Sequence, residues 1–399
     1  MKYNSHLIKT GSHLDLVAEM EKIGADPAGI KIMAPKAELK IVKAEQLSLK
    51  AVNILKQEML SRGGDVVVHK EVSMLKKDFS DVLIIGTRKQ YWELIHKLKV
   101  QPFGLKELAT ELQGILRSEH LGINEKTLIG NHREIHLGNQ TLVMGILNIT
   151  PDSFSDGGKY IELDLALERA KEMIEFGADI IDIGGESTRP GHAPVSMEEE
   201  IRRVIPIIKK LSNEIDVPIS IDTYKAEVAK QAILAGANII NDVWGFKKDP
   251  EMAKVAAELG VPVILMHNRE QPVEHSLMEV MIKELRESIF LAIQAGVREE
   301  NIILDPGIGF GKTYQDNLIV MNRLDEIVSL GFPVLLGTSR KSFIGLTLDL
   351  PVEDRIEGTS ATVALGISKG CKIVRVHDVK EMKRVCKMMD AMIYVNNKG

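Results

Sequence analysis

Residues 142–159 read Leu-Val-Met-Gly-Ile-Leu-Asn-Ile-Thr-Pro-Asp-Ser-Phe-Ser-Asp-Gly-Gly-Lys, an apolar run followed at once by polar side chains. The apolar part predicts a buried strand, because short runs of this kind are typical of strands covered on both faces. The polar part carries two carboxylates, an amide, three hydroxyls and an aromatic ring. Such a loop indicates a binding site, and its oxygen atoms suit a metal ion together with a polyanion.

Similar apolar runs recur along the rest of the chain. From about residue 140 they alternate with longer amphipathic stretches, which predicts repeated βα units around a parallel sheet. Several amphipathic stretches end in a glycine, such as Gly177 and Gly260, where a helix is expected to stop. Eight such units predict a (β/α)8 (TIM) barrel over residues 126–399. The expected strands are residues 142–147, 179–183, 218–221, 238–241, 262–266, 301–304, 333–336 and 372–376.

Residues 1–125 lack this repeat and are predicted to form a smaller accessory α/β domain. They contain an expected helix at residues 44–62 and expected strands at residues 65–69 and 81–85. With 399 residues and 44% hydrophobic content, the chain is large enough for two cores. Ahead of the first barrel strand, residues 133–137 and 140–143 flank Gly138 and Asn139. This pattern predicts a β-hairpin that closes the barrel floor.

Composition excludes several classes of protein. The net charge of −5 provides no basic field, so nucleic acid is not expected as a partner. The two cysteines, Cys371 and Cys386, form no CxxC pair, which argues against structural zinc and a disulfide framework. The N-terminal residues lack a secretory signal, and no stretch is apolar enough to span a membrane. We therefore expect a soluble cytoplasmic protein.

Polar residues follow all eight predicted strands. In a (β/α)8 barrel the chemistry lies at the C-terminal strand ends, so each of these residues is a site candidate. A single Asp or Asn there is more simply explained as a helix cap, and Asp242 is a candidate for that role, as Glu186 is for a loop brace. Polar groups at every strand end are harder to explain in this way. They predict an active site at this end of the barrel.

The residue types at three strand ends suggest a flat heterocyclic ligand. Asp222, Asn241 and Asp305 combine carboxylates with an amide, which suits a ring with several N–H donors and a carbonyl, such as a pterin or a purine. Lys341 lies in a Ser-Arg-Lys-Ser context and is expected to donate to the same ring. The glycine-rich run at residues 307–311 lacks the GxGxxG spacing of a nucleotide loop and is expected to position Phe310 over the cavity.

A second group of residues suits an anion. Arg375 and His377 are two positions apart and share one face of the last strand, where they form a cationic pocket for phosphate oxygens. Asn148 and the carboxylates of the following loop are candidates to hold Mg²⁺ against that anion, since magnesium takes few protein ligands and shares substrate phosphates. No Ser–His or Cys–His pair for nucleophilic catalysis is evident in the sequence.

Seven motifs in order, over about residues 130–395, resemble the dihydropteroate synthase family, the sulfonamide targets of the folate pathway. The most specific are Gly-Ile-Leu-Asn-Ile-Thr-Pro-Asp-Ser-Phe-Ser-Asp-Gly at residues 145–157 and Asp-Ile-Gly-Gly-Glu-Ser-Thr-Arg-Pro-Gly at residues 182–191. The others are Ser-Ile-Asp-Thr at 220–223, Asn-Asp-Val at 241–243, Asp-Pro-Gly-Ile-Gly-Phe-Gly-Lys at 305–312, Ser-Arg-Lys-Ser at 339–342 and Arg-Val-His-Asp at 375–378.

The resemblance implies a transferase that condenses 6-hydroxymethyl-7,8-dihydropterin pyrophosphate with p-aminobenzoate, giving 7,8-dihydropteroate and pyrophosphate. It implies that Asp222, Asn241, Met266, Asp305 and Lys341 bind the pterin, with Asp222, Asp305 and Lys341 as the catalytic residues. It also implies that Asn148, Arg375 and His377 bind pyrophosphate, that Asn148 and Asp156 bind Mg²⁺, and that the p-aminobenzoate pocket comprises Phe154, Thr188, Arg189, Pro190, Phe310 and Ser342. Family members are commonly homodimers, which is the expectation here.

The chain departs from the family pattern in two places. The family often has Met-His-Met-x-Gly after the fifth strand, whereas residues 266–270 read Met-His-Asn-Arg-Glu. The domain at residues 1–125 lies outside the common family core. Two alternatives remain open: a pterin-binding methyltransferase acting between a folate and a corrinoid, and a catalytically silent pterin-binding scaffold. The methyltransferase has no pyrophosphate to hold and so no need of the loop at residues 150–156.

Overall fold

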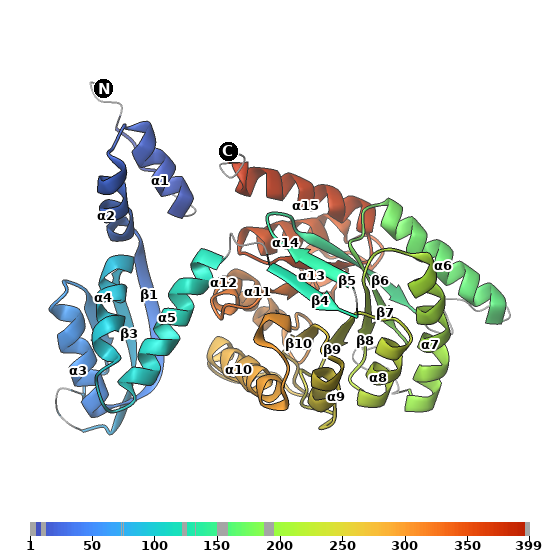
Figure 1. Ribbon diagram of the computed structural model, residues 1–399, viewed down its shortest axis with the longest axis horizontal. Coiled ribbons are helices and arrows are strands. Elements are labelled where there is room, and N and C mark those ends of the chain that lie inside the picture. Colours follow the sequence, from blue (N-terminus) through green and yellow to red (C-terminus); the bar gives the residue numbers. More distant parts are fainter. Residues whose placement is uncertain are drawn as a thin grey trace. The chain divides into compact units, whose positions relative to one another are not determined.

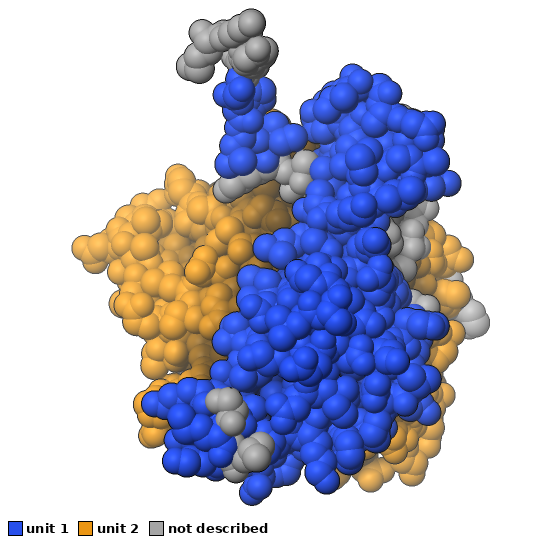
Figure 2. Space-filling model, turned by 90° about the vertical axis from the view of Figure 1, so that its left-hand side faces the viewer, with its two compact units in different colours: residues 1–120, 396–399 blue, residues 121–395 orange. Residues whose placement is uncertain are grey.

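The chain divides into two compact units. The computed structural model describes residues 5–8, 13–72, 74, 76–121, 126–131, 133–149, 159–186 and 195–395. One unit comprises residues 1–120 with 396–399, and the other comprises residues 121–395 (Figure 2). The predicted boundary between residues 125 and 126 falls just after the observed one.

The larger unit is a parallel eight-stranded barrel (Figure 1). The strand order is β11-β10-β9-β8-β7-β6-β13-β12, and a parallel bridge between Leu304 and Val334 links the two ends of this order. All eight predicted barrel strands are confirmed. They are β6 (Leu142–Asn148), β7 (Ile180–Gly184), β8 (Ile219–Asp222), β9 (Ile239–Asp242), β10 (Val263–Met266), β11 (Ile302–Asp305), β12 (Leu335–Leu336) and β13 (Ile373–Val376).

Helices surround this barrel, as the fold predicted from the sequence requires (Figure 1). They are α6 (Lys159–Glu175), α7 (Met197–Glu214), α8 (Ala226–Leu234), α9 (Met252–Leu259), α10 (Leu277–Ala295), η2 (Glu299–Asn301), α11 (Tyr314–Asn322), α12 (Leu324–Val328), α13 (Ser342–Leu348), α14 (Ile356–Ser368) and α15 (Val379–Ile393). Their apolar faces pack on the outward side chains of the strands in one continuous core. Strands with buried side chains on both faces explain why the apolar runs are uninterrupted.

A β-hairpin covers the N-terminal end of the barrel, but its strands differ from the predicted ones. β4 (Lys126–Gly130) pairs antiparallel with β5 (Arg133–Leu137), and residues 142–148 belong to the barrel instead. The turn lies at Asn131, whose φ of 45° is left-handed, rather than at Gly138. Leu128, Ile135 and Leu137 of the hairpin pack on the inward side chains of the strands. The predicted closure of the floor is thus confirmed with a corrected register.

The smaller unit is an α/β domain with a three-stranded antiparallel sheet in the order β1-β3-β2. Residues 44–48, predicted as helix, instead belong to β1, in which Ala44, Leu47 and Ser48 pair with β3 on either side of an irregularity. The Ser48 hydroxyl then caps the helix by accepting the Ala51 N–H. The elements are α1 (His13–Lys22), α2 (Pro27–Ala37), β1 (Leu39–Ser48), α3 (Leu49–Leu60), β2 (Asp65–Val68), β3 (Phe79–Thr87), α4 (Arg88–Leu98) and α5 (Leu105–Leu121). In the part of the chain described, none of the helices is both long and apolar enough to cross a bilayer.

Candidate active site

A pocket opens at the C-terminal ends of the barrel strands, where the sequence predicted the site. Eight of the predicted site residues line it together, although they come from six different strand ends. They are Asp222, Asn241, Met266, Asp305, Phe310, Lys341, Arg375 and His377. The barrel therefore gathers side chains that are up to about 150 residues apart in the chain, as expected for this end of a (β/α)8 fold.

Arg375 lines the pocket and is paired with two carboxylates. Its Nε donates to Asp182 Oδ2 at 2.6 Å, and its Nη2 donates to Asp222 Oδ2 at 2.7 Å. Asp182 is fully buried within β7 and is also approached by the Asn241 amide nitrogen at 3.4 Å. The two carboxylates raise the pKa of Arg375, although burial opposes them. The guanidinium is thus permanently charged and held by its partners.

The two aspartates that were predicted to bind the pterin are buried, and the pKa of each carboxyl group is raised above its ordinary value. Burial raises the pKa of Asp222 to about 7, although Arg375 opposes this shift. Burial also raises the pKa of Asp305 to about 6, whereas the Gly307 N–H and the charges of Lys341 and Arg375 lower it. Asp222 Oδ1 is buried and has no hydrogen-bond partner among the described residues. A buried carboxylate oxygen without a donor is costly and marks a place where a ligand N–H can bind.

Lys341 lies against Phe310, with its Nζ 4.0 Å from the centre of the ring. The residue before it, Arg340, has a φ of 57°, a left-handed conformation that is uncommon for arginine. The Arg340 guanidinium holds this turn by donating to both oxygens of Asp378, at 3.0 and 2.6 Å. Strained backbone of this kind clusters at functional sites. Helix α13 then begins at Ser342, and the Ser342 side chain is exposed.

His377 pairs with a serine that sequence analysis did not identify. Ser339 Oγ accepts the backbone N–H of His377 at 3.1 Å, which leaves its own hydrogen to donate to His377 Nδ1 at 3.0 Å. The sequence showed no Ser–His pair for nucleophilic catalysis, and this pair was not visible because 38 residues separate its members. Ser339 is only 5% exposed and gives its hydrogen to the ring, so the pair orients the imidazole rather than activating a nucleophile.

Several predicted residues lie beside the pocket or outside the described residues. Asn148 is the last residue of β6. Its Oδ1 lies 3.6 Å from the position that a Cβ on Gly184 would take, and the Asp222 side chain lies close to the same position. Within the described ranges, no group of three or more His, Cys, Asp or Glu side chains is placed to hold a metal ion. Predicted residues that fall outside the described ranges are Phe154, Asp156, Thr188, Arg189 and Pro190.

Two residues have the structural roles for which they were candidates. Asp242 caps the turn after β9, where its oxygens accept the backbone N–H groups of Trp244 and Phe246 at 2.8 and 2.7 Å. Glu186 braces the end of β7 through Lys225, whose Nζ lies 2.5 Å from Glu186 Oε2. The same ammonium donates to the carbonyl oxygen of Val195 at 2.8 Å. Lys225 therefore links Glu186 to Val195.

The fold and the pocket agree with comparisons to known proteins. The pterin binding enzyme family matches residues 144–377, more than half of the chain. The chain belongs to this family of barrel enzymes. Within the family it groups with the dihydropteroate synthases. The dihydropteroate synthase of Bacillus subtilis is 65% identical over 260 residues, which cover 65% of this chain and 90% of that protein.

A solved structure supports the same grouping. The dihydropteroate synthase of Clostridium difficile, crystallised in the presence of pteroic acid, matches with a TM-score of 0.63 and 52% identity. The match covers 64% of this chain and 98% of that chain, so it corresponds to the barrel unit.

The smaller unit has a counterpart in a longer relative. A probable bifunctional folylpolyglutamate synthase/dihydropteroate synthase of Halobacterium salinarum is 41% identical over 379 residues, or 93% of this chain. The matched residues cover 45% of that protein. Because the match exceeds the barrel unit, residues of the N-terminal unit are shared with this long relative.

Proposed function

We propose that this chain is a dihydropteroate synthase of folate biosynthesis, a transferase that joins 6-hydroxymethyl-7,8-dihydropterin pyrophosphate to p-aminobenzoate and releases pyrophosphate. The observation that carries the proposal is the convergence of Asp222, Asn241, Met266, Asp305 and Lys341 on one pocket. The 65% identity to a dihydropteroate synthase supports the same reaction.

The pterin ring is proposed to lie on the pocket floor. Its N–H groups pair with the carboxylates of Asp222 and Asp305 and with the Asn241 amide, and its carbonyl accepts from Lys341. Asp222 Oδ1, buried and without a donor among the described residues, is the acceptor that this pairing satisfies. Met266, which is 4% exposed, packs against the flat face of the ring.

The departing pyrophosphate is proposed to lie beside Arg375, His377 and Asn148. Negative charge grows on this group as the C–O bond breaks, so cationic groups stabilise the transition state more than the ground state. Asn148 supplies an amide oxygen of the kind that Mg²⁺ accepts, and Asp156 is the proposed second ligand. Bound Mg²⁺ would neutralise charge on the leaving group. The pterin then carries the developing cation until the amine attacks, so no protein nucleophile is required.

The p-aminobenzoate is proposed to bind between Phe310 and Ser342, with Phe154, Thr188, Arg189 and Pro190 completing its pocket. Phe310 lines the observed cavity and contacts Lys341, so the two substrates meet near these side chains. Sulfonamides, which resemble p-aminobenzoate, are expected to compete for this place. We also propose that the enzyme acts in the cytoplasm as a homodimer; exposed Phe290 and Leu291 on α10 are candidates for its interface.

The reaction is tested by pyrophosphate release from the dihydropterin pyrophosphate and Mg²⁺, with and without p-aminobenzoate. Release that depends on the amine supports the proposal. Tight pterin binding without release would favour a silent scaffold. Methyl transfer from a folate to a corrinoid would favour the methyltransferase. Removal of Mg²⁺ with EDTA is expected to abolish release, and Mg²⁺ addition to restore it.

Pterin affinity is expected to fall as the pH is lowered. Ligand N–H groups favour the ionised form of Asp305, whose pKa is about 6 in the free site, so the free site binds more protons than the complex. Affinity for the dihydropterin alcohol, which has no phosphate, should therefore drop several-fold between about pH 7.5 and about pH 5.5. Calorimetric titration across this range measures the effect.

Asp305→Asn is the control for this pH dependence. The amide cannot ionise, so the variant should bind more weakly at neutral pH and should lose the part of the pH dependence that Asp305 contributes, whereas the part due to Asp222, whose pKa is about 7, remains. An affinity of the unaltered protein that stays flat across the range would contradict the assignment of Asp305 to the pterin.

A further inference from the structure

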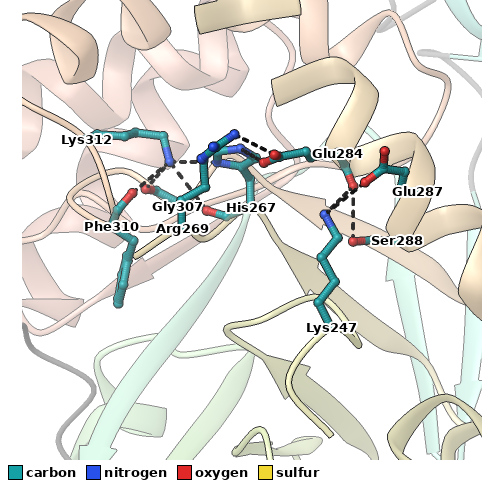
Figure 3. Close-up of polar contacts among 9 residues, drawn as sticks. All are labelled: Lys247, His267, Arg269, Glu284, Glu287, Ser288, Gly307, Phe310 and Lys312. Carbon is teal, nitrogen blue, oxygen red and sulfur yellow. Dashed lines mark hydrogen bonds and ion pairs between the residues drawn. The ribbon is translucent and has the colours of Figure 1, made fainter. Parts of the chain in front are cut away.

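A partly buried lysine, Lys312, lies outside the pocket lining and joins two of the loops that form the site. Lys312 Nζ donates to His267 Nδ1 at 2.9 Å, to the Gly307 carbonyl oxygen at 2.9 Å and to the Phe310 carbonyl oxygen at 3.0 Å (Figure 3). His267 follows β10, whereas Gly307 and Phe310 follow β11. An ammonium has three N–H donors, so these short contacts use all of its capacity.

The link continues from His267 to α10. Because Nδ1 accepts from Lys312, the ring proton lies on Nε2, which donates to Glu284 Oε2 at 2.9 Å. Burial lowers the pKa of His267 to about 4, so the imidazole is neutral at physiological pH. Glu284 Oε1 accepts from Arg269 at 2.5 Å, which ties the same loop to α10 a second time (Figure 3). Glu284 thus anchors the loop after β10.

The two loops also touch through their backbones. Gly307 has a φ of +64°, and a Cβ there would lie 1.9 Å from the carbonyl oxygen of His267. Gly311 has a φ of +52°, and its Cβ would lie 2.2 Å from the carbonyl oxygen of Arg269. Only glycine fits these approaches. The two loops are therefore packed without space between their backbones at these points. If the contacts of Lys312 change, the loop after β11 is expected to shift.

Phe310 is the point at which this link reaches the pocket. Its carbonyl oxygen accepts from Lys312, and its ring lies under Lys341 Nζ at 4.0 Å. Phe310 lines the pocket, whereas Lys312 does not. We propose that Lys312 is a positioning residue that fixes Phe310, and with it the p-aminobenzoate site, by binding the loops after β10 and β11 to each other. This inference rests on the proposed function.

Burial and the neighbouring charges act on the pKa of Lys312 in opposite directions. Burial lowers the pKa of Lys312 to about 7, whereas the carboxylates of Asp305, Asp316 and Glu284 raise it and Lys341 lowers it further. The three acceptors favour the protonated form, which alone fills all of them. Lys312 does not line the pocket, so its proposed effect on the reaction is indirect.

The first test compares Lys312→Met with Lys247→Met. Methionine keeps the length of the side chain but donates no hydrogen bond, and we expect KM for p-aminobenzoate to rise about tenfold, with KM for the dihydropterin pyrophosphate changed by less than about threefold. Lys247 donates to the Glu284 carbonyl oxygen in the same cluster and pairs with Glu287, and both of these partners lie on α10 (Figure 3). Lys247→Met should leave both KM values unchanged.

A double-mutant cycle tests the route through Phe310. If Lys312 acts by placing that ring, Lys312→Met in a Phe310→Ala background should add less than about twofold to KM for p-aminobenzoate. Equal effects of Lys312→Met on both substrates, or full additivity with Phe310→Ala, would overturn the proposal. So would a lower melting temperature with both KM values unchanged.

Two variants of His267 provide a second test if Lys312→Met folds poorly. Asn places its amide oxygen where Nδ1 lies and keeps the contact with Lys312; Gln reaches toward Glu284 instead. His267→Asn should therefore retain KM for p-aminobenzoate, and His267→Gln should raise it; the reverse order would contradict the proposal. Crystal structures of the unaltered protein and Lys312→Met show whether the Phe310 ring moves, and this result does not depend on the reaction.

Discussion

Lys341→Ala is expected to reduce kcat/KM for the dihydropterin pyrophosphate by about 100-fold, because a hydrogen bond from a charged donor contributes about 1.5–3 kcal/mol. Lys341 lines the pocket and lies 4.0 Å from the Phe310 ring centre, so its removal takes a cation from the place where both substrates meet. The melting temperature should change little, since the side chain is only half-buried. Steady-state kinetics with each substrate varied in turn measure the loss.

Lys248→Ala is a matched control for this variant. Lys248 also lies over an aromatic ring, 4.6 Å from the centre of Trp244, but it is absent from the pocket lining. Its removal deletes a comparable cation–π contact without touching the site, so kcat/KM should stay within about twofold of the original value. Equal kinetics for both variants would show that Lys341 does not contact the pterin.

Arg375→Met is expected to destabilise the barrel unit by about 3 kcal/mol and to abolish turnover, because it leaves buried carboxylates without their cation. Asp182 is fully buried and Asp222 is 5% exposed, and both bind the Arg375 guanidinium at 2.6–2.7 Å. Urea denaturation followed by circular dichroism measures the stability, and the pyrophosphate assay measures the turnover.

A second substitution distinguishes the loss of charge pairing from the change in side-chain shape as the cause of the lower stability. Adding Asp182→Asn to Arg375→Met removes one of the two unpaired charges and should recover a substantial part of the stability without restoring turnover. If the double variant were no more stable than Arg375→Met alone, the charge pairing would not be the source of the loss. A stable, active Arg375→Met protein would contradict the role of Arg375 in the pocket.

The barrel could be predicted from the sequence because its signals are local. Each parallel strand is buried on both faces and therefore reads as a continuous apolar run, and glycines such as Gly260, with a φ of 65°, end the helices. The strand at residues 44–48 was missed for the opposite reason. Its Ala, Glu and Gln residues favour helix, whereas the pairing of Ala44, Leu47 and Ser48 with the distant β3 places the segment in a strand.

The site was predicted in outline, and its supporting residues were not. Asp182 lies in the middle of an apolar run, and a carboxylate in a buried strand was the one signal that pointed to it. Its partner Arg375 is 193 residues away, so the pair is visible only in the fold. Lys312 appeared in the sequence only as the last residue of the motif at 305–312, and its role was not visible because its partner His267 belongs to another strand end. Residue types predict the ligand, whereas the contacts that position those residues depend on packing.

The most direct test of the central claim is chromatography of 7,8-dihydropteroate formed by the full chain and by Asp305→Asn. The account predicts product from the unaltered chain only when the dihydropterin pyrophosphate, Mg²⁺ and p-aminobenzoate are all present. It predicts that Asp305→Asn, folded and otherwise intact, forms product about 100-fold more slowly. A chain that binds the dihydropterin pyrophosphate at this pocket yet makes no dihydropteroate, or an Asp305→Asn variant with full activity, would contradict it.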